Sequence, residues 1–150
     1  MTTLQKGDKA PAFSGVDQDG KAHTLADYKG KKLVVFFYPK ADTPGCTAEA
    51  CDLRDNYERF QANNYALLGV SADAAKKQAK FKEKYSFPFP LIADENHAVI
   101  NAFGVWGPKK FMGREFDGIR RTTFIIDENG IIEEVISKVE TKAHAAQILK

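Results

Sequence analysis

The chain contains two cysteines, Cys46 and Cys51, which are separated by four residues and follow the sequence Thr43-Pro44-Gly45. The Pro-Gly step and the periodic apolar residues after it predict that a helix begins here and covers both thiols. Residues five positions apart in an α-helix have Cα atoms about 8.7 Å apart and side chains about 140° apart. A disulfide needs Cα atoms about 4.4–6.8 Å apart. The thiols are therefore either inert structural groups or a redox pair that bonds only after local unwinding.

The position of each cysteine in the predicted helix assigns it a different task. With Thr43 as N-cap, Pro44 occupies the first helical position and Cys46 the third. The free N–H groups of the first turn and the helix dipole favour a thiolate at Cys46. Cys51 lies beyond this influence, and we expect it to keep a more ordinary pKa. Cys46 is thus predicted to be the attacking nucleophile, and Cys51 the resolving thiol that reacts with Cys46 afterwards.

Thiolate formation alone does not make a fast catalyst. Lowering a cysteine pKa from about 8.5 toward about 6 raises the thiolate fraction at pH 7 by at most about thirtyfold, and lower intrinsic nucleophilicity removes most of that gain. Donors must also stabilise the transition state. The candidates are the Thr43 hydroxyl, the N–H groups of Gly45 and Cys46, and an arginine from elsewhere in the chain.

The helices and strands that must position these groups are predicted to form an α/β fold. An unbroken apolar run over 33–38 predicts a strand buried on both faces, and 44–63 has helical periodicity. The remaining expected elements are a hairpin over 12–25, strands at 65–71 and 91–92, helices over 74–85 and 96–103, strands at 122–126 and 131–135 around the turn 127–130, and a helix from 141. We expect a central mixed β-sheet flanked by helices, with an N-terminal β-hairpin. The thioredoxin-like fold is the natural candidate, because open α/β sheets place their sites beyond the carboxyl ends of strands.

Composition narrows the class of protein. The chain has 150 residues, 43% hydrophobic and 28% charged, with a net charge of +2. We expect a single domain over 1–150, and the charge gives no reason to expect a nucleic-acid or membrane partner. The absence of a signal-peptide core or a long apolar run favours a cytoplasmic protein with reduced thiols.

Several motifs resemble one known family. The pattern Pro39-x-x-x-Thr43-x-x-Cys46 is similar to the signature of peroxiredoxins. The continuation Thr47-x-Glu49-Ala50-Cys51 resembles the peroxiredoxin Q subfamily, also called bacterioferritin comigratory protein. Further similar segments are 7–13, 36–40, 103–107 and 121–127, so the resemblance covers nearly the whole chain.

The resemblance implies a role for each motif residue. Cys46 would be the peroxidatic cysteine, which attacks the O–O bond of a hydroperoxide and becomes a sulfenic acid. Thr43 would hydrogen-bond the peroxide, and Pro39 would shield the sulfur from water. Arg121 would hold the thiolate and the developing charge. Cys51 would resolve the sulfenic acid through an intramolecular disulfide, which is the atypical 2-Cys scheme.

The resemblance also implies partners. The substrate would be hydrogen peroxide or an organic hydroperoxide, and thioredoxin or a similar dithiol protein would reduce the disulfide. No metal, haem or flavin is required, because the thiolate supplies the electrons. A monomer or weak dimer is expected.

Some alternatives stay open on sequence alone. Arg120 replaces Arg121 in the site if the strand register shifts by one, and Glu49 either pairs with an arginine or is exposed. Cys51 is either the resolving thiol or a buried structural one. Tyr38 and Trp106 are interpreted as packing residues, and the scattered His23, His97 and His144 have no zinc-site spacing. Two other functions compete: a dithiol oxidoreductase, which usually has a C-x-x-C spacing, and a non-catalytic peroxide sensor.

Overall fold

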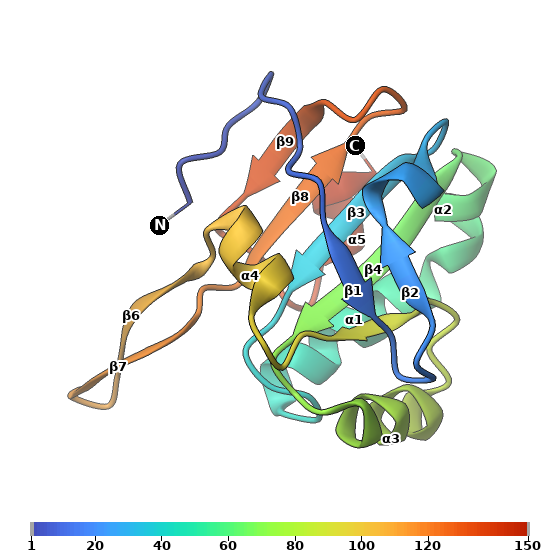
Figure 1. Cartoon of the computed structure of the whole chain (residues 1–150). Helices are drawn as coiled ribbons and strands as arrows, with labels where there is room; N and C mark the ends of the chain where they lie inside the picture. The colour runs from blue at the N-terminus through green and yellow to red at the C-terminus, as the bar shows by residue number, and fades with distance from the viewer. Residues whose placement is uncertain (1, 150) are drawn as a thin grey trace.

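The computed structural model describes residues 2–149 and is built around a five-stranded mixed sheet (Figure 1). The strand order is β5-β4-β3-β8-β9. Strands β3 (Lys32–Phe37), β4 (Tyr65–Ser71) and β5 (Leu91–Ala93) are parallel, whereas β8 (Thr122–Ile126) and β9 (Ile132–Ile136) run antiparallel to their neighbours. The predicted central mixed sheet is therefore confirmed.

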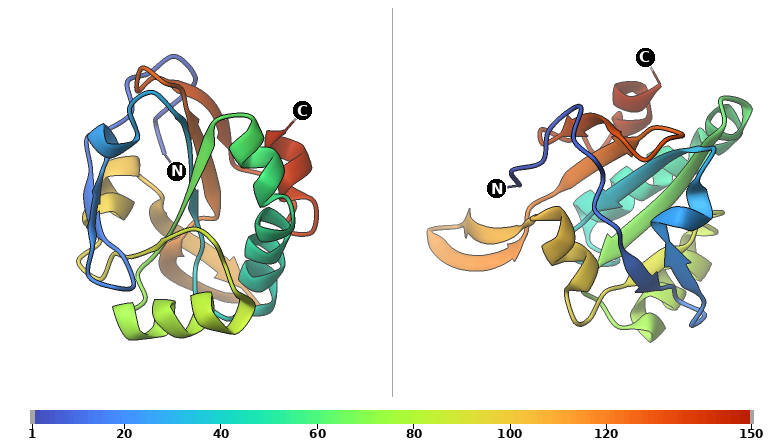
Figure 2. Two further views of the ribbon diagram at one scale, coloured as in Figure 1. Left: turned by 90° about the vertical axis from the view of Figure 1, so that its right-hand side faces the viewer. Right: turned by 45° about the horizontal axis from the view of Figure 1, so that its top comes forward.

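Helices cover both faces of this sheet. Helices α1 (Pro44–Asp55), α2 (Tyr57–Ala62) and α5 (His144–Ile148) lie on one side, and α3 (Ala75–Tyr85) packs beside β5 (Figure 2). Helix α4 (Ala98–Phe103) and the hairpin of β1 (Ser14–Val16) and β2 (Ala22–Thr24) lie on the other side, with a 3₁₀ turn at Leu25–Tyr28. No helix in residues 2–149 is long and apolar enough to span a membrane.

Strand β3 explains why its sequence is an unbroken apolar run. Val34 and Phe36 enter the core beneath α1, whereas Leu33, Val35 and Phe37 enter the core beneath α4. Successive side chains of a strand point to opposite faces, so a central strand between two helical layers needs apolar residues at every position. This strand leads directly into the loop before α1.

The loop before α1 is fixed by polar contacts from neighbouring strands and α3. The Ala41 N–H donates to Asp73 Oδ2 at 2.7 Å. The Tyr38 hydroxyl donates to Gln78 Oε1 at 2.6 Å, and Gln78 Nε2 donates to Ser71 Oγ at 2.9 Å and to the Ile92 carbonyl at 2.8 Å. Gln78 therefore joins the carboxyl ends of β3, β4 and β5, where α1 must start.

Two details differ from the sequence prediction. The single helix expected over 44–63 is broken at Asn56, whose backbone has φ −108° and ψ 13°. Its side-chain amide donates to the Asp52 carbonyl at 2.8 Å, a local bond of the kind that competes with helix propagation.

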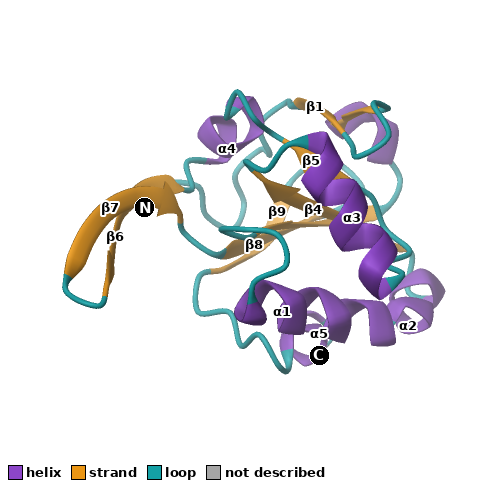
Figure 3. Ribbon diagram, turned by 90° about the horizontal axis from the view of Figure 1, so that it is seen from below, coloured by secondary structure: helices purple, strands orange, loops and turns teal. Residues whose placement is uncertain are grey.

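The second difference is an unpredicted hairpin of β6 (Trp106–Phe111) and β7 (Arg114–Ile119), which extends away from the sheet (Figure 3). Met112 and Gly113 form its turn with φ of 52° and 79°. Most of its described side chains are exposed, so it lacks the apolar alternation of a half-buried hairpin.

Tyr38→Phe tests the polar network that fixes the ends of these strands. The change leaves Gln78 Oε1 buried without its donor, and we expect the free energy of unfolding to fall by about 1–3 kcal/mol. Tyr85→Phe is the control, because its hydroxyl meets Asp42 at the surface, and its effect should stay within about 0.5 kcal/mol. Urea denaturation of both variants measures the difference, and equal losses would contradict this role for Gln78.

Candidate active site

Both cysteines lie within α1 and are free thiols. The helix begins at Pro44, which places Cys46 at its third position, and the Cys46 side chain is buried. Cys51 is partly buried one and a half turns further on. The helix therefore holds the two sulfurs apart in this state.

Arg121 joins the Cys46 sulfur to a buried carboxylate. Its Nη2 lies 3.3 Å from Cys46 Sγ, and its Nη1 donates to Glu49 Oε1 at 2.7 Å. Glu49 is completely buried, so of the two interpretations offered by the sequence the paired one is confirmed and the exposed one is wrong. Arg120 instead donates from Nη2 to the Pro108 carbonyl at 2.7 Å, at the base of the protruding hairpin.

Gly45 leaves the space that the guanidinium occupies. A Cβ atom at this position would lie 3.2 Å from Arg121 Nη2, tighter than an ordinary van der Waals contact. A larger residue here would require the guanidinium to shift by a few tenths of an ångström.

Burial dominates the electrostatics of the site. It raises the pKa of Glu49 to about 7, although the Arg121 guanidinium acts in the opposite direction. Burial by itself lowers the pKa of Arg121, but the neighbouring Cys46 sulfur and Glu49 carboxylate outweigh it, and the pKa is raised. Burial also raises the pKa of Cys51, so this thiol receives no help in ionising while α1 is folded.

Thr43 stands at the N-cap position, with φ −99° and ψ 156°, but its side chain makes no capping bond. The hydroxyl donates to the Lys40 carbonyl at 2.8 Å instead. The predicted N-cap position of Thr43 is therefore confirmed, although its hydroxyl bonds a carbonyl of the preceding loop and not a helix N–H.

An open hollow of about 420 Å³ borders the arginine. Its lining includes Pro39, Arg121 and Thr122, together with Lys109 of β6. Burial lowers the pKa of Lys109. No motif in the sequence marks Lys109, since only the unpredicted hairpin brings it here.

The aromatic residues and histidines considered in the sequence lie at separate positions in the structure. Tyr38 is buried core, and Trp106 is partly exposed with its ring 4.4 Å from that of His97. His23 is buried beside Asp17 in the N-terminal hairpin. His144, treated as one of three scattered histidines, is fully buried with Nε2 3.5 Å from Glu49 Oε2. No group of three or more His, Cys, Asp or Glu side chains suited to a metal ion occurs within residues 2–149.

Comparison with known proteins gives consistent matches. Residues 6–135 match the model of the AhpC/TSA family. A putative peroxiredoxin bcp of Haemophilus influenzae is 47% identical over 99% of this chain and 96% of its own length. Peroxiredoxin Bcp of Escherichia coli is 46% identical, with the same coverage of both chains.

Solved structures of similar proteins have the same fold as this chain. Peroxidoxin BcpB of Mycobacterium tuberculosis superimposes with a TM-score of 0.86 and 37% identity, covering 97% of this chain and 94% of that one. A PrxQ variant of Xylella fastidiosa gives a TM-score of 0.92 and 31% identity, with coverage of 99% and 95%. A bacterioferritin comigratory protein of Xanthomonas campestris, described for its alkyl peroxide reduction activity, superimposes with a TM-score of 0.87 and 32% identity. The match covers 99% of this chain and 95% of that one. The expected thioredoxin-like fold is thereby confirmed.

Arg121→Gln tests the charge contact at the sulfur. Removing the guanidinium that lies 3.3 Å from Cys46 Sγ should slow alkylation of Cys46 by iodoacetamide at pH 7 about tenfold, since a thiolate there loses its neighbouring opposite charge. The measurement uses a Cys51→Ser background, so that one thiol reports, and circular dichroism checks folding. Arg120→Gln is the matched control and should react close to the parent rate; equal slowing by both changes would contradict the assignment.

Proposed function

The chain belongs to the AhpC/TSA family, as a peroxiredoxin of the Bcp/PrxQ group, and on this premise we propose that it is a thioredoxin-dependent atypical 2-Cys peroxiredoxin. In this scheme Cys46 reduces hydroperoxides and Cys51 resolves the product. The observation that carries the proposal is the Arg121 Nη2 contact with Cys46 Sγ at 3.3 Å, in the first turn of a helix.

In the first step the Cys46 thiolate attacks the terminal oxygen of the hydroperoxide. The O–O bond breaks, the sulfur becomes a sulfenic acid, and the leaving oxygen takes up a proton to form water or an alcohol. Arg121 stabilises the thiolate and the charge that develops on the oxygens. Thr43 holds the peroxide and Pro39 limits the access of water to the sulfur.

In the second step the Cys51 sulfur attacks the sulfenic sulfur of Cys46. The S–O bond breaks, water leaves and a disulfide forms. This bond requires α1 to unwind, because helical residues at this spacing lie about 8.7 Å apart between Cα atoms. The burial that raises the Cys51 pKa is also lost when the helix opens. Unwinding therefore both brings the thiol within reach and makes it easier to ionise.

In the last step thioredoxin, or a similar dithiol protein, reduces the disulfide and α1 refolds. Alkyl hydroperoxides are included among the substrates by analogy with the activity described for the Xanthomonas campestris relative. The hollow of about 420 Å³ beside Arg121 supports this, since it leaves room for an organic group. A cytoplasmic location and a monomeric or weakly dimeric state belong to the same proposal.

Cys51→Ser separates the two cysteine roles. With one equivalent of peroxide the variant should form the sulfenic acid at Cys46, and it should fail to sustain NADPH oxidation with thioredoxin and thioredoxin reductase. With excess peroxide a second equivalent should convert the unresolved sulfenic acid to sulfinic acid. Stopped-flow oxidation, the coupled assay and mass spectrometry measure these quantities. Cys46→Ser is the control and should not react at all. Wild-type protein that is oxidised once and then stalls in the coupled assay would instead indicate a peroxide sensor.

Hydrogen exchange tests the unwinding of α1. We expect amides over 43–56 to lose protection in the disulfide form, because the helix and the disulfide are geometrically incompatible. Amides of α3 serve as the internal control and should be unchanged. A disulfide form in which α1 keeps the protection seen in the reduced protein would refute this part of the mechanism.

A further inference from the structure

Lys109 borders the hollow beside Arg121 and has no role in the mechanism above. It lies on β6 of the protruding hairpin and lines the hollow together with Pro39 and Arg121. The lysine is partly buried. Its ammonium group nevertheless forms no hydrogen bond or ion pair with any residue of 2–149. Lys109 is therefore a cation at the edge of the site without an anionic partner.

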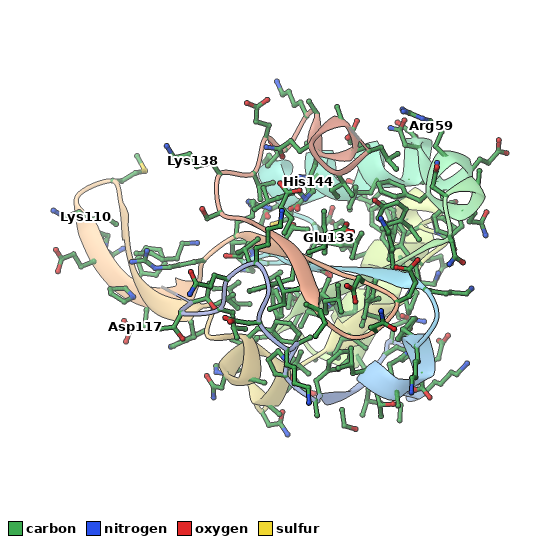
Figure 4. The ribbon with its side chains drawn as sticks, turned by 90° about the horizontal axis from the view of Figure 1, so that it is seen from above. Arg59, Lys110, Asp117, Glu133, Lys138 and His144 are labelled. Carbon is green, nitrogen blue, oxygen red and sulfur yellow. The ribbon has the colours of Figure 1, made fainter. Side chains whose placement is uncertain are left out.

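The register of the hairpin gives Lys109 and its neighbour Lys110 different surroundings. Lys110 stands opposite Glu115 and forms an ion pair with it at 3.8 Å, whereas Lys109 stands opposite Phe116. Glu115 and Asp117 flank Phe116 in β7, so their side chains point to the opposite face of the ribbon. Figure 4 shows Lys110 on the outer part of the hairpin, away from the body of the molecule. The hairpin therefore keeps these carboxylates off the face that bears Lys109.

Gly118 allows the Lys109 side chain to lie along the hairpin toward the site. A Cβ atom at position 118 would lie 3.3 Å from Lys109 Cδ and 3.7 Å from Phe116 Cε2. The aliphatic stem of Lys109 therefore passes over Gly118, beside the Phe116 ring. Gly118 is two residues nearer the base of the hairpin than Phe116, which is the register partner of Lys109. The stem is thus directed back toward Arg121.

The charges around the hollow are positive. Its basic lining residues are Lys109, Lys110, Arg120 and Arg121, and within residues 2–149 no carboxylate lines it. Burial lowers the pKa of Lys109, and Arg121 lowers it further, whereas the Cys46 sulfur acts in the opposite direction. The charge at the reacting sulfur is therefore felt at Lys109. Arg121 already serves Cys46 and a buried carboxylate, so Lys109 is the cation that an incoming anion would stabilise.

We propose that Lys109 binds a carboxylate of an organic hydroperoxide whose peroxy group lies at Cys46 and Arg121. Lys109 is then a specificity-determining residue, which favours carboxylate-bearing hydroperoxides over neutral ones of the same shape. The inference deepens the proposed function and rests on it. Phe116, which is 47% exposed beside the lysine stem, offers apolar surface to the organic part of such a substrate. Hydrogen peroxide has no second group and gains nothing from this contact.

Two hydroperoxides of the same shape test the role of Lys109. Cumene hydroperoxide is neutral, and its para-carboxylate derivative carries one negative charge. Rapid quench and mass spectrometry in a Cys51→Ser background give the rate constant of Cys46 oxidation by each, and the ratio of charged to neutral substrate is compared between variants. Lys109→Met should lower this ratio about fivefold, because the ion pair is lost, whereas Lys109→Arg should retain most of it. Sodium chloride should lower the ratio for the parent but not for Lys109→Met.

Lys138→Met is the matched control, because it removes the same charge from an exposed lysine next to Ser137, which lines the hollow. In Figure 4 Lys138 lies at the periphery, on the loop that follows β9. Its ratio should stay within about twofold of the parent value, since a solvated charge is screened. An unchanged ratio in Lys109→Met would overturn the proposal. An equal fall in Lys138→Met would also overturn it, because the preference would then come from the general positive field.

Binding of the reaction product separates this inference from the proposed function. The alcohol formed from the charged substrate, the para-carboxylate derivative of cumyl alcohol, has no O–O bond and cannot oxidise a thiol. Added to the reduced wild-type protein, it should shift the amide resonances of β6 and β7, and these shifts should be lost in Lys109→Met. Neutral cumyl alcohol should shift them much less. Equal shifts with both alcohols, or none with the carboxylate, would refute the subsite, whereas failure of the peroxidase proposal is recognised by the coupled assay.

Discussion

The arrangement of the site depends on the contacts that the guanidinium of Arg121 makes. It is shared between the Cys46 sulfur and the Glu49 carboxylate, at 3.3 Å and 2.7 Å. Both partners are buried in α1, whereas the arginine comes from the chain just before β8. A buried anion is tolerated only with a well-placed opposite charge. The start of β8 and the first turns of α1 must therefore stay in register with each other, and Gly45 keeps the space between them open.

Helix α1 combines two requirements that oppose each other. Its first turn positions Cys46, and Glu49 on its next turn completes the ion pair with Arg121. The same regular helix keeps Cys51 away from Cys46 and partly buried. A sequence that stabilised this helix too strongly would protect the nucleophile but prevent the proposed disulfide. In the proposed cycle the break at Asn56 would confine the opening to α1 itself, while α2 stays packed on β4.

The elements around α1 define what moves with it. On the side of β3, β4 and β5, Gln78 of α3 joins three strand ends and fixes the loop that precedes the helix. On the other side, α5 is tied to α1 by the Asp52–Ala145 bond and by the proximity of His144 to Glu49. Because Glu49 lies between the two cysteines, the unwinding of α1 in the proposed cycle would separate it from Arg121 and from His144 together. The contacts of the C-terminal helix with α1 would then change in the same step.

The sequence by itself determined the features that rest on local patterns. The apolar run of β3 and the Thr-Pro-Gly-Cys start of α1 are readable from residues close together in the chain, and so is the geometric conflict between a helix and a disulfide at this cysteine spacing. The family resemblance also pointed to Arg121. The break at Asn56 and the side-chain bond of Thr43 depend on local carbonyl acceptors, which the residue pattern does not distinguish from a regular helix and a capping bond. Tertiary structure alone decided where the β6–β7 hairpin lies and that Cys51 is partly buried, because both depend on packing. It also decided the partners of Glu49, since burial and the approach of Arg121 and His144 depend on segments that meet only when β8 and α5 pack against α1.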